Sequence, residues 1–250
     1  MSIYFGAICD EFAVSTRLHL KLELPDSRET ILHFLERVRR EFPKMGRLRR
    51  RSDGSLILEE SGDSAERMWL RLDGTCLRFG HLNPPDLDRP SALAAVVLEQ
   101  APYHLTLSDL DTDRLELVYS FDLDYCGNHD RLVAETLMAD HPLAGLMTSQ
   151  SATHIIECQP CIGVALTNDC DLQAYVELRS RSTTYDASKG QYEPRPLTVN
   201  LSVRRYWGFG HDTDLLSTHG LLREHADRLA AEYVAPLIVN PLAHAIASRP

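Results

Sequence analysis

Hydrophobic and polar side chains alternate most regularly between Val14 and Leu24. Valine, threonine and leucine occupy the even positions there, and serine, arginine, histidine, lysine and glutamate occupy the odd ones. A period of two predicts a β-strand with one buried and one solvent-facing side. The pattern returns between Leu115 and Tyr125. We therefore expect one long amphipathic strand early in each half of the chain.

A helical pattern follows each of these strands. After the first strand, Asp26 and Glu29 have the spacing of a capping box, and apolar residues recur at helical spacing until Pro43. After the second strand, Asn128 is the expected N-cap of a helix that carries Leu132. Strand and helix therefore recur in the same order in both halves.

Two further helices are predicted, one at the end of each half. Pro90 suits the first turn of an amphipathic helix that should stop at Pro102. A long closing helix should run from about Asp214 towards Tyr233.

Short strands account for the rest of the ordered chain. Asp53-Gly54 and Asp73-Gly74 lie between apolar runs and predict two hairpins, which supply four strands to the first half. The second half should have four strands after its helix, at 154–157, 162–166, 172–179 and 197–205.

These elements predict an α+β fold built from two β-α-β4-α halves that share an antiparallel sheet. The expected boundaries are 1–108 and 109–250. The halves differ most at 180–196, where a long polar hairpin loop replaces a tight turn. We interpret the order of elements as a duplicated pattern.

This order of elements resembles the TATA-binding protein fold, and each half is similar to a helix-grip domain, in which a long helix closes over a curved antiparallel sheet. The resemblance implies topology alone. DNA bending by the TATA-binding protein needs a basic concave sheet with apolar wedges, whereas this chain is acidic.

A second resemblance covers most of the chain. Glu41-Phe42-Pro43 ends a helix before paired strands, 115–125 forms a central strand, and Leu215-Leu-Ser-Thr-His219 precedes a late apolar segment, Pro236-Leu-Ile238. This arrangement resembles a sporadically distributed family of uncharacterised prokaryotic proteins. The resemblance implies the same organisation and supplies no catalytic residues.

Charge narrows the range of partners. The chain has 26 basic and 36 acidic side chains, a formal net charge of -10. That charge disfavours nucleic acid and anionic membranes as partners. A basic island at 36–51 is the exception. It is either a solvated helix end that runs into an exposed strand or, at 47–51, a local nucleic-acid contact.

The most specific local cluster is His154, Cys158 and Cys161, with Cys170 further along the chain. Thiolates and an imidazole at such spacing are typical zinc ligands. The alternative is that these cysteines are small buried hydrophobes, since only one CxxC pair is present. Similarly, Asn128-His129-Asp130 fits a helix N-terminus better than acid-base chemistry.

The expected recognition surface combines the polar side of the first strand with the 180–196 loop and an aromatic strand end. Its candidate binding residues are Arg17, His19, Lys21, Tyr185, Tyr192 and Trp207. Trp207 begins the run Trp-Gly-Phe-Gly-His211, an aromatic segment that suits either a contact site or packing on the last helix.

We therefore expect a non-enzymatic, cytoplasmic binding or accessory module that recognises a protein partner or a small ligand and has no cofactor. The sequence contains no nucleophile elbow, phosphate loop or dinucleotide fingerprint. It contains no basic, apolar leader at its start and no long apolar run. The alternative is a small-molecule or zinc-dependent enzyme of the helix-grip type, with its site in the second half.

Overall fold

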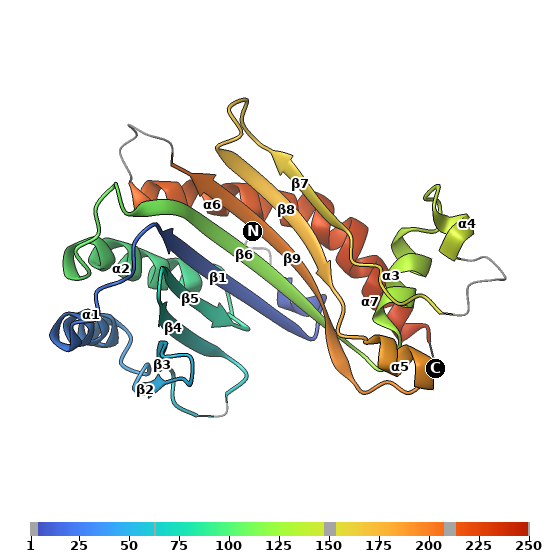
Figure 1. The fold of residues 1–250 in the computed structure, drawn as a ribbon, viewed down its shortest axis with the longest axis horizontal. Coiled ribbons are helices and arrows are strands. Elements are labelled where there is room, and N and C mark those ends of the chain that lie inside the picture. The colour runs from blue at the N-terminus through green and yellow to red at the C-terminus, as the bar shows by residue number, and fades with distance from the viewer. Residues whose placement is uncertain (1–4, 63, 148–153, 208–213, 250) are drawn as a thin grey trace.

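One large antiparallel sheet organises the molecule. The computed structural model describes residues 5–62, 64–147, 154–207 and 214–249. Within these residues, nine strands form a single sheet in the order β2-β3-β4-β5-β1-β6-β9-β8-β7 (Figure 1). The strands are β1 (Glu11–Leu20), β2 (Arg47–Arg50), β3 (Leu56–Glu59), β4 (Arg67–Asp73), β5 (Cys76–Leu82), β6 (Thr112–Tyr125), β7 (Cys161–Ala165), β8 (Leu172–Arg179) and β9 (Arg195–Tyr206).

Helices cover one side of this sheet and leave the other side open. In Figure 1 the open side faces the viewer, and the closing helix passes behind the later strands. Helix α2 packs on β5, and helix α6 packs on β6 and β9. The helical elements are η1 (Phe5–Ala7), α1 (Arg28–Glu41), α2 (Asp88–His104), α3 (His129–Leu137), α4 (Ala144–Met147), α5 (Thr184–Lys189), α6 (Leu215–Leu229), η2 (Ala230–Val239) and α7 (Asn240–Ala247).

The predicted α+β class with a shared antiparallel sheet is confirmed. Strands β1 and β6, the two long strands with the clearest alternation, pair with each other at its centre. The other strands of the first half extend outwards from β1, and those of the second half extend outwards from β6. The junction of the two halves is therefore a strand pair inside one sheet.

The second half differs from its predicted β-α-β4-α pattern, because the strand expected at 154–157 is absent. This segment is irregular chain. The Asn128 side chain donates to the carbonyl of Ile155, and the amide of Cys158 donates to the Asp130 carboxylate. Side chains at the start of α3 thus form hydrogen bonds with backbone groups that, in a strand, would bond to a neighbouring strand. The polar 180–196 segment also differs from a plain loop, because it contains α5.

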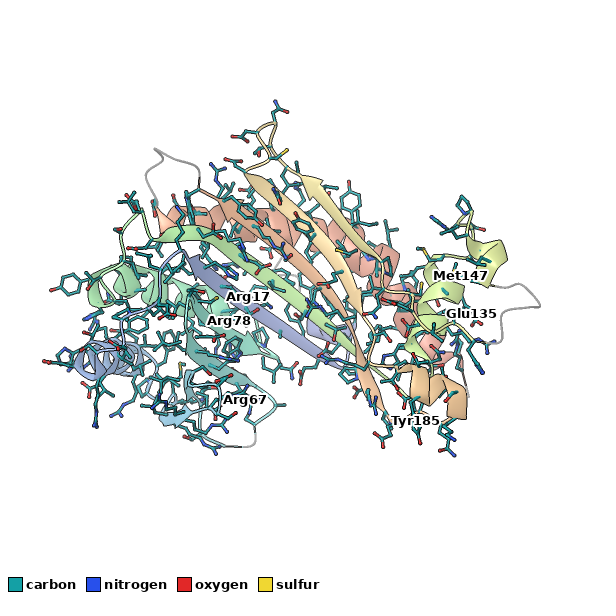
Figure 2. All side chains as sticks on the ribbon, viewed as in Figure 1. Arg17, Arg67, Arg78, Glu135, Met147 and Tyr185 are labelled. Atoms are coloured by element: carbon teal, nitrogen blue, oxygen red, sulfur yellow. The ribbon has the colours of Figure 1, made fainter. Side chains whose placement is uncertain are left out.

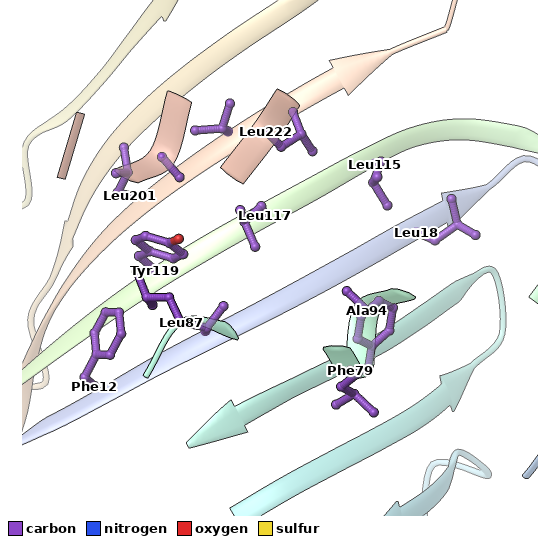
Figure 3. Close-up of a cluster of buried hydrophobic side chains, with 14 of the residues drawn as sticks. Phe12, Leu18, Phe79, Leu87, Ala94, Leu115, Leu117, Tyr119, Leu201 and Leu222 are labelled. Atoms are coloured by element: carbon purple, nitrogen blue, oxygen red, sulfur yellow. The ribbon is translucent and has the colours of Figure 1, made fainter. Parts of the chain in front are cut away.

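The core lies between the sheet and the helices (Figure 3). Burial alternates along β1, and its even positions face α2 and α6. Phe12 contacts the rings of Tyr119 and Phe121 from the neighbouring strand, at centroid distances of 5.6 and 5.1 Å. Leu222 of α6 is also fully buried there. The alternation read from the sequence therefore identifies which side of each central strand is dry.

The closing helix is longer than predicted. It continues through the π-helical segment η2, which contains Pro236, and ends at Ala247. A proline lacks the amide needed for the α-helical ladder, and a π-helical turn is a common place for such an interruption. Among the described residues, the continuous helix Leu215–Ala247 is the one that length and composition would allow to cross a bilayer. Here it packs along the sheet.

Helix boundaries depart from the sequence predictions at two places. Helix α1 has Ser27 as its N-cap, rather than Asp26. Helix α2 passes through Pro102 and ends at His104. The Asn128 cap is confirmed, because its side chain accepts a hydrogen bond of 2.9 Å from the Arg131 amide.

Replacing Asn128 with alanine should lower the free energy of unfolding by about 1 kcal/mol, because both the cap and the bond to Ile155 are lost. Urea unfolding measures this change. Asn128→Ser keeps a capping oxygen and should recover part of the loss. Equal stability of the alanine variant and the native protein would contradict this role.

Candidate functional site

Charged side chains form a line across the open side of the sheet. The strand register places Arg71 of β4 opposite Arg78 of β5, and Arg78 opposite Arg17 of β1. Arg17 in turn lies opposite Glu116 of β6, which lies opposite Arg204 of β9. We call these five residues the arginine row. At about 4.8 Å between strands, the row is about 19 Å long.

Glu116 is the buried anion of the row. Only 3% of its side chain is exposed, although it lies on the open side. Its Oε1 accepts from Arg204 Nε at 2.6 Å, and its Oε2 accepts from Arg17 Nη1 at 3.3 Å. Burial is the largest influence and raises the pKa of Glu116, but His19 and the two arginines outweigh it and lower the pKa to about 2. Glu116 is therefore ionised across the physiological range.

Positive charge exceeds negative charge along the row. Arg71, Arg78 and Arg17 are directly opposed on adjacent strands, and like charges in that position repel. Asp73 lies 3.4 Å from Arg71 and 3.2 Å from Arg78, and Arg71 also pairs with Asp53 at 2.9 Å. The Nε atoms of Arg71 and Arg78 are buried without a hydrogen-bond partner among the described residues. The row's four guanidinium groups thus pair with three carboxylates, Asp53, Asp73 and Glu116, in a chain that is acidic overall.

Aromatic rings hold the later end of the row in place. The Arg204 guanidinium lies over the ring of Tyr175, with its carbon 4.3 Å from the ring centroid. Arg114, beside the row on β6, lies 5.7 Å from the centroid of Tyr206. Cation–π contact of this kind orients a guanidinium without using its hydrogen-bond donors. Arg204 is therefore held by Glu116 and by the Tyr175 ring, with 28% of its side chain exposed.

A cysteine and a histidine lie beside the row. Cys76 of β5 is directly opposite His19 of β1 on the open side. Both ring nitrogens of His19 have polar neighbours. His19 Nε2 lies 3.4 Å from Glu116 Oε2, and His19 Nδ1 lies 3.3 Å from the Arg114 guanidinium. His19 therefore lies between Cys76 and the buried carboxylate of the row in the strand register.

The structure brings together only some of the predicted binding residues. Arg17 and His19 lie on the open side at the centre of the sheet, and Lys21 follows β1 and is exposed. Tyr185 lies on α5 at the far end of the sheet from Arg17 (Figure 2). Tyr192 follows α5, and so belongs to that distant end. The predicted surface therefore divides into two separate regions.

Trp207 is the last described residue before a gap. It follows β9, its amide donates to the Asp113 carbonyl at 3.3 Å, and its side chain packs on the core. The remainder of the predicted aromatic segment, 208–211, lies outside the described residues. Trp207 therefore lies just past the end of β9, and its side chain is directed towards the core rather than the open side.

The four predicted zinc ligands do not form one site. Cys161 begins β7, whereas Cys170 lies beyond the other end of this strand in the turn to β8. From Cys161 to Ala165 the strand spans about 14 Å, too far for a shared ion. His154 and Cys158 belong to the irregular chain beside α3. Among the described residues, no group of three or more metal-binding side chains is present.

The polar cluster at the start of α3 joins loops together. Asp130 is buried and accepts from the Cys158 amide at 2.8 Å and from the Ser180 hydroxyl at 2.7 Å. His129 is also buried, and its Nδ1 accepts from the Arg181 amide at 3.1 Å. Burial lowers the pKa of His129. These bonds use the two side chains to hold the 154–160 and 180–183 segments.

The later part of the basic island, 47–50, forms the edge strand β2. All four residues of β2 are exposed, and Arg49 forms an ion pair of 2.6 Å with Glu59. Arginines on an exposed edge strand discourage pairing with another sheet. The arrangement therefore gives the island a structural role independent of any ligand.

No protein-family model, curated protein or solved structure matches this chain. The functional argument therefore depends on the geometry of the open side. Sequence reasoning identified Arg17 and His19 but missed Arg78, Glu116 and Arg204. Each of them is a polar position on a predicted strand, and only the strand order reveals that they meet.

Proposed function

We propose that this protein is a non-enzymatic binding module whose open sheet side recognises an acidic segment of a partner protein through the arginine row. The direct opposition of Arg71, Arg78 and Arg17 carries this proposal. Carboxylates from a partner would relieve the repulsion between these guanidinium groups and accept hydrogen bonds from the partly exposed side chains of Arg17 and Arg78.

The length of the row supports an extended partner over a small anion. A single phosphate or carboxylate reaches two or three guanidinium groups, whereas the row extends over five strands, about 19 Å. An extended acidic peptide repeats its side chains on one face about every 7 Å and therefore covers the row with several carboxylates. Electrostatic complementarity of this type mainly provides specificity and fast association.

The proposal extends to the organisation and compartment of the protein. We propose that the two halves arose by duplication, with topology similar to the TATA-binding protein, since the strands of each half extend outwards from one member of the β1–β6 pair. We also propose a cytoplasmic location, because all six cysteines are free thiols, as a reducing compartment favours.

A labelled hexaglutamate peptide tests the binding proposal by fluorescence anisotropy. The native protein should bind it, and the affinity should fall as salt is raised. The variant Arg17→Gln/Arg78→Gln should bind at least about fivefold more weakly. Arg37→Gln is the matched control, because it removes a charge from exposed α1, where Arg37 pairs with Glu41 at 3.6 Å.

Two outcomes would overturn the proposal. Equal affinity of the double variant and the native protein would show that the row is not the site. Displacement of the peptide by inorganic phosphate at far lower ionic strength than by chloride would identify a small-anion site instead.

A further inference from the structure

The two edges of the sheet differ in their protection against pairing with another strand. Strand β7 is the last strand of the described sheet, and all five of its residues are exposed (Figure 1). It contains no charged residue and no proline. The opposite edge strand, β2, has the sequence Arg-Leu-Arg-Arg. Proteins block edge strands with charges or prolines, because an open edge pairs readily with another chain. The β7 edge lacks that protection.

Backbone hydrogen bonds show which groups of β7 point away from the sheet. The Leu178 amide donates to the Pro160 carbonyl at 3.1 Å, and the Leu166 amide donates to the Leu172 carbonyl at 2.8 Å. Bonded positions alternate along an antiparallel strand, so the even positions of β7 bond to β8. The odd positions therefore direct their amides and carbonyls outwards, where no described strand pairs with them. These positions are Cys161, Gly163 and Ala165.

The side chains of β7 allow another strand to approach closely. On the open side, the ring of Tyr175 covers Gly163, where a β-carbon would lie 2.5 Å from the ring. Ile162 and Val164 lie on the side that faces the helices, because they are opposite the apolar positions of β8. They nevertheless remain 65% and 50% exposed. Free backbone groups beside exposed apolar side chains are what an added β-strand uses.

The sequence of β7 is complementary to itself about Gly163. When a second copy of β7 lies antiparallel with its Gly163 opposite Gly163, Cys161 is opposite Ala165 and Ile162 is opposite Val164. Each outward-facing pair then exchanges two hydrogen bonds, and the two apolar pairs meet on the helix side. One strand thus supplies every group that its copy requires, as a twofold interface demands.

We propose that β7 is the contact strand of a symmetric dimer, in which it pairs antiparallel with β7 of a second copy of this chain and continues the sheet across both molecules. Strand β2 excludes further growth, because pairing there would desolvate its arginines. The contact is one strand wide, so the dimer is weak and reversible, with a dissociation constant in the micromolar range. This inference is independent of the proposed peptide binding.

Sedimentation velocity under reducing conditions, at protein concentrations from about 1 µM to about 1 mM, measures the dimer. The mass should rise from that of the monomer towards twice that value and no further. Added salt should strengthen the dimer, because each copy carries a net charge of -10, whereas salt should weaken peptide binding. Ile162→Lys should weaken the dimer at least about tenfold. Leu48→Lys, at an exposed leucine of the β2 edge, is the matched control and should change it little.

A disulfide measures the register of the two strands. Ala165→Cys places a thiol opposite Cys161 of the second copy, at a Cα separation of about 5.5 Å that a disulfide can bridge. Mild oxidation should then produce a covalent dimer. Ala165→Cys/Cys161→Ser lacks the opposing thiol and should produce far less of it. The substituted positions are all exposed, so these variants should fold.

A monomeric mass at every concentration would overturn the proposal and leave the β7 edge to a strand of a different protein. A dimer that Ile162→Lys leaves as strong as in the native protein would also overturn it. Equal cross-linking of the two cysteine variants would contradict the register, and growth beyond two copies would contradict the closed dimer.

Discussion

Replacing Glu116 with glutamine is expected to lower the free energy of unfolding by about 3 kcal/mol. The carboxylate is 3% exposed and pairs with Arg17, Arg204 and His19. Without it, guanidinium groups that share the row have no buried counter-ion. The value lies at the low end for a broken buried pair, because the arginines remain about a third exposed and water screens part of the repulsion.

Urea unfolding measures this loss as a midpoint shift of about 1 M. Glu177→Gln is the matched control, since Glu177 forms an exposed pair with Arg179 at 2.9 Å; its effect should stay below about 0.5 kcal/mol. Removing Arg204 as well, in Glu116→Gln/Arg204→Gln, should restore part of the stability. A single variant as stable as the control would show that the carboxylate does not balance the row.

Acid should destabilise the protein between about pH 6.5 and pH 4, and His219 should be a principal cause. His219 of α6 is buried against the sheet, 3.2 Å from the Thr16 hydroxyl. Burial is the first influence on its pKa and the Arg223 cation is the second, and together they lower the pKa to about 4. The folded protein therefore holds this histidine neutral.

The direction in which stability changes with pH depends on whether the folded or the unfolded protein binds the His219 proton more tightly. The unfolded chain protonates His219 near its ordinary pKa of about 6.5, whereas the folded protein does so only near 4. The contribution of His219 is thus fully present above pH 6.5 and is lost as the pH falls to 4, to a total of about 3 kcal/mol. Burial also lowers the pKa of His81 and His129, so they act in the same direction.

Unfolding free energies at pH 7.5 and pH 4.5 isolate this effect. His219→Gln keeps a polar group near Thr16 without titrating, so its stability should fall by less than that of the native protein over this interval. His33→Gln, at an exposed position of α1, serves as the control. An identical fall in His219→Gln and the native protein would assign the acid sensitivity to other groups.

Local sequence patterns predicted the local structure correctly where backbone preferences and the order of polar and apolar side chains favour the same element. The alternation in β1 and β6, the two Asp-Gly hairpins and the Asn128 cap are each encoded within a few neighbouring residues. The strand expected at 154–157 is absent because side chains of α3 bind its backbone instead. Local composition does not contain that long-range competition.

The candidate site was only partly accessible to sequence reasoning for a related reason. Alternation places Arg17, Glu116 and Arg204 on polar faces of three strands, but it does not specify which strands are neighbours. The order β5-β1-β6-β9 brings these residues into one line from positions far apart in the chain. The predicted zinc set shows the converse, because Cys161 and Cys170 are close in sequence, yet Cys161 begins β7 and Cys170 lies past its other end.

The most direct test of the binding proposal observes the guanidinium groups themselves. NMR of the arginine Nε–Hε pairs, assigned through single Arg→Lys variants, follows each signal as hexaglutamate peptide is added. The signals of Arg17, Arg78 and Arg204 should shift first and saturate together, while those of Arg37 and Arg131 on the helices should stay in place. Shifts confined to the β2 arginines, or spread evenly over all arginines, would contradict recognition through the arginine row.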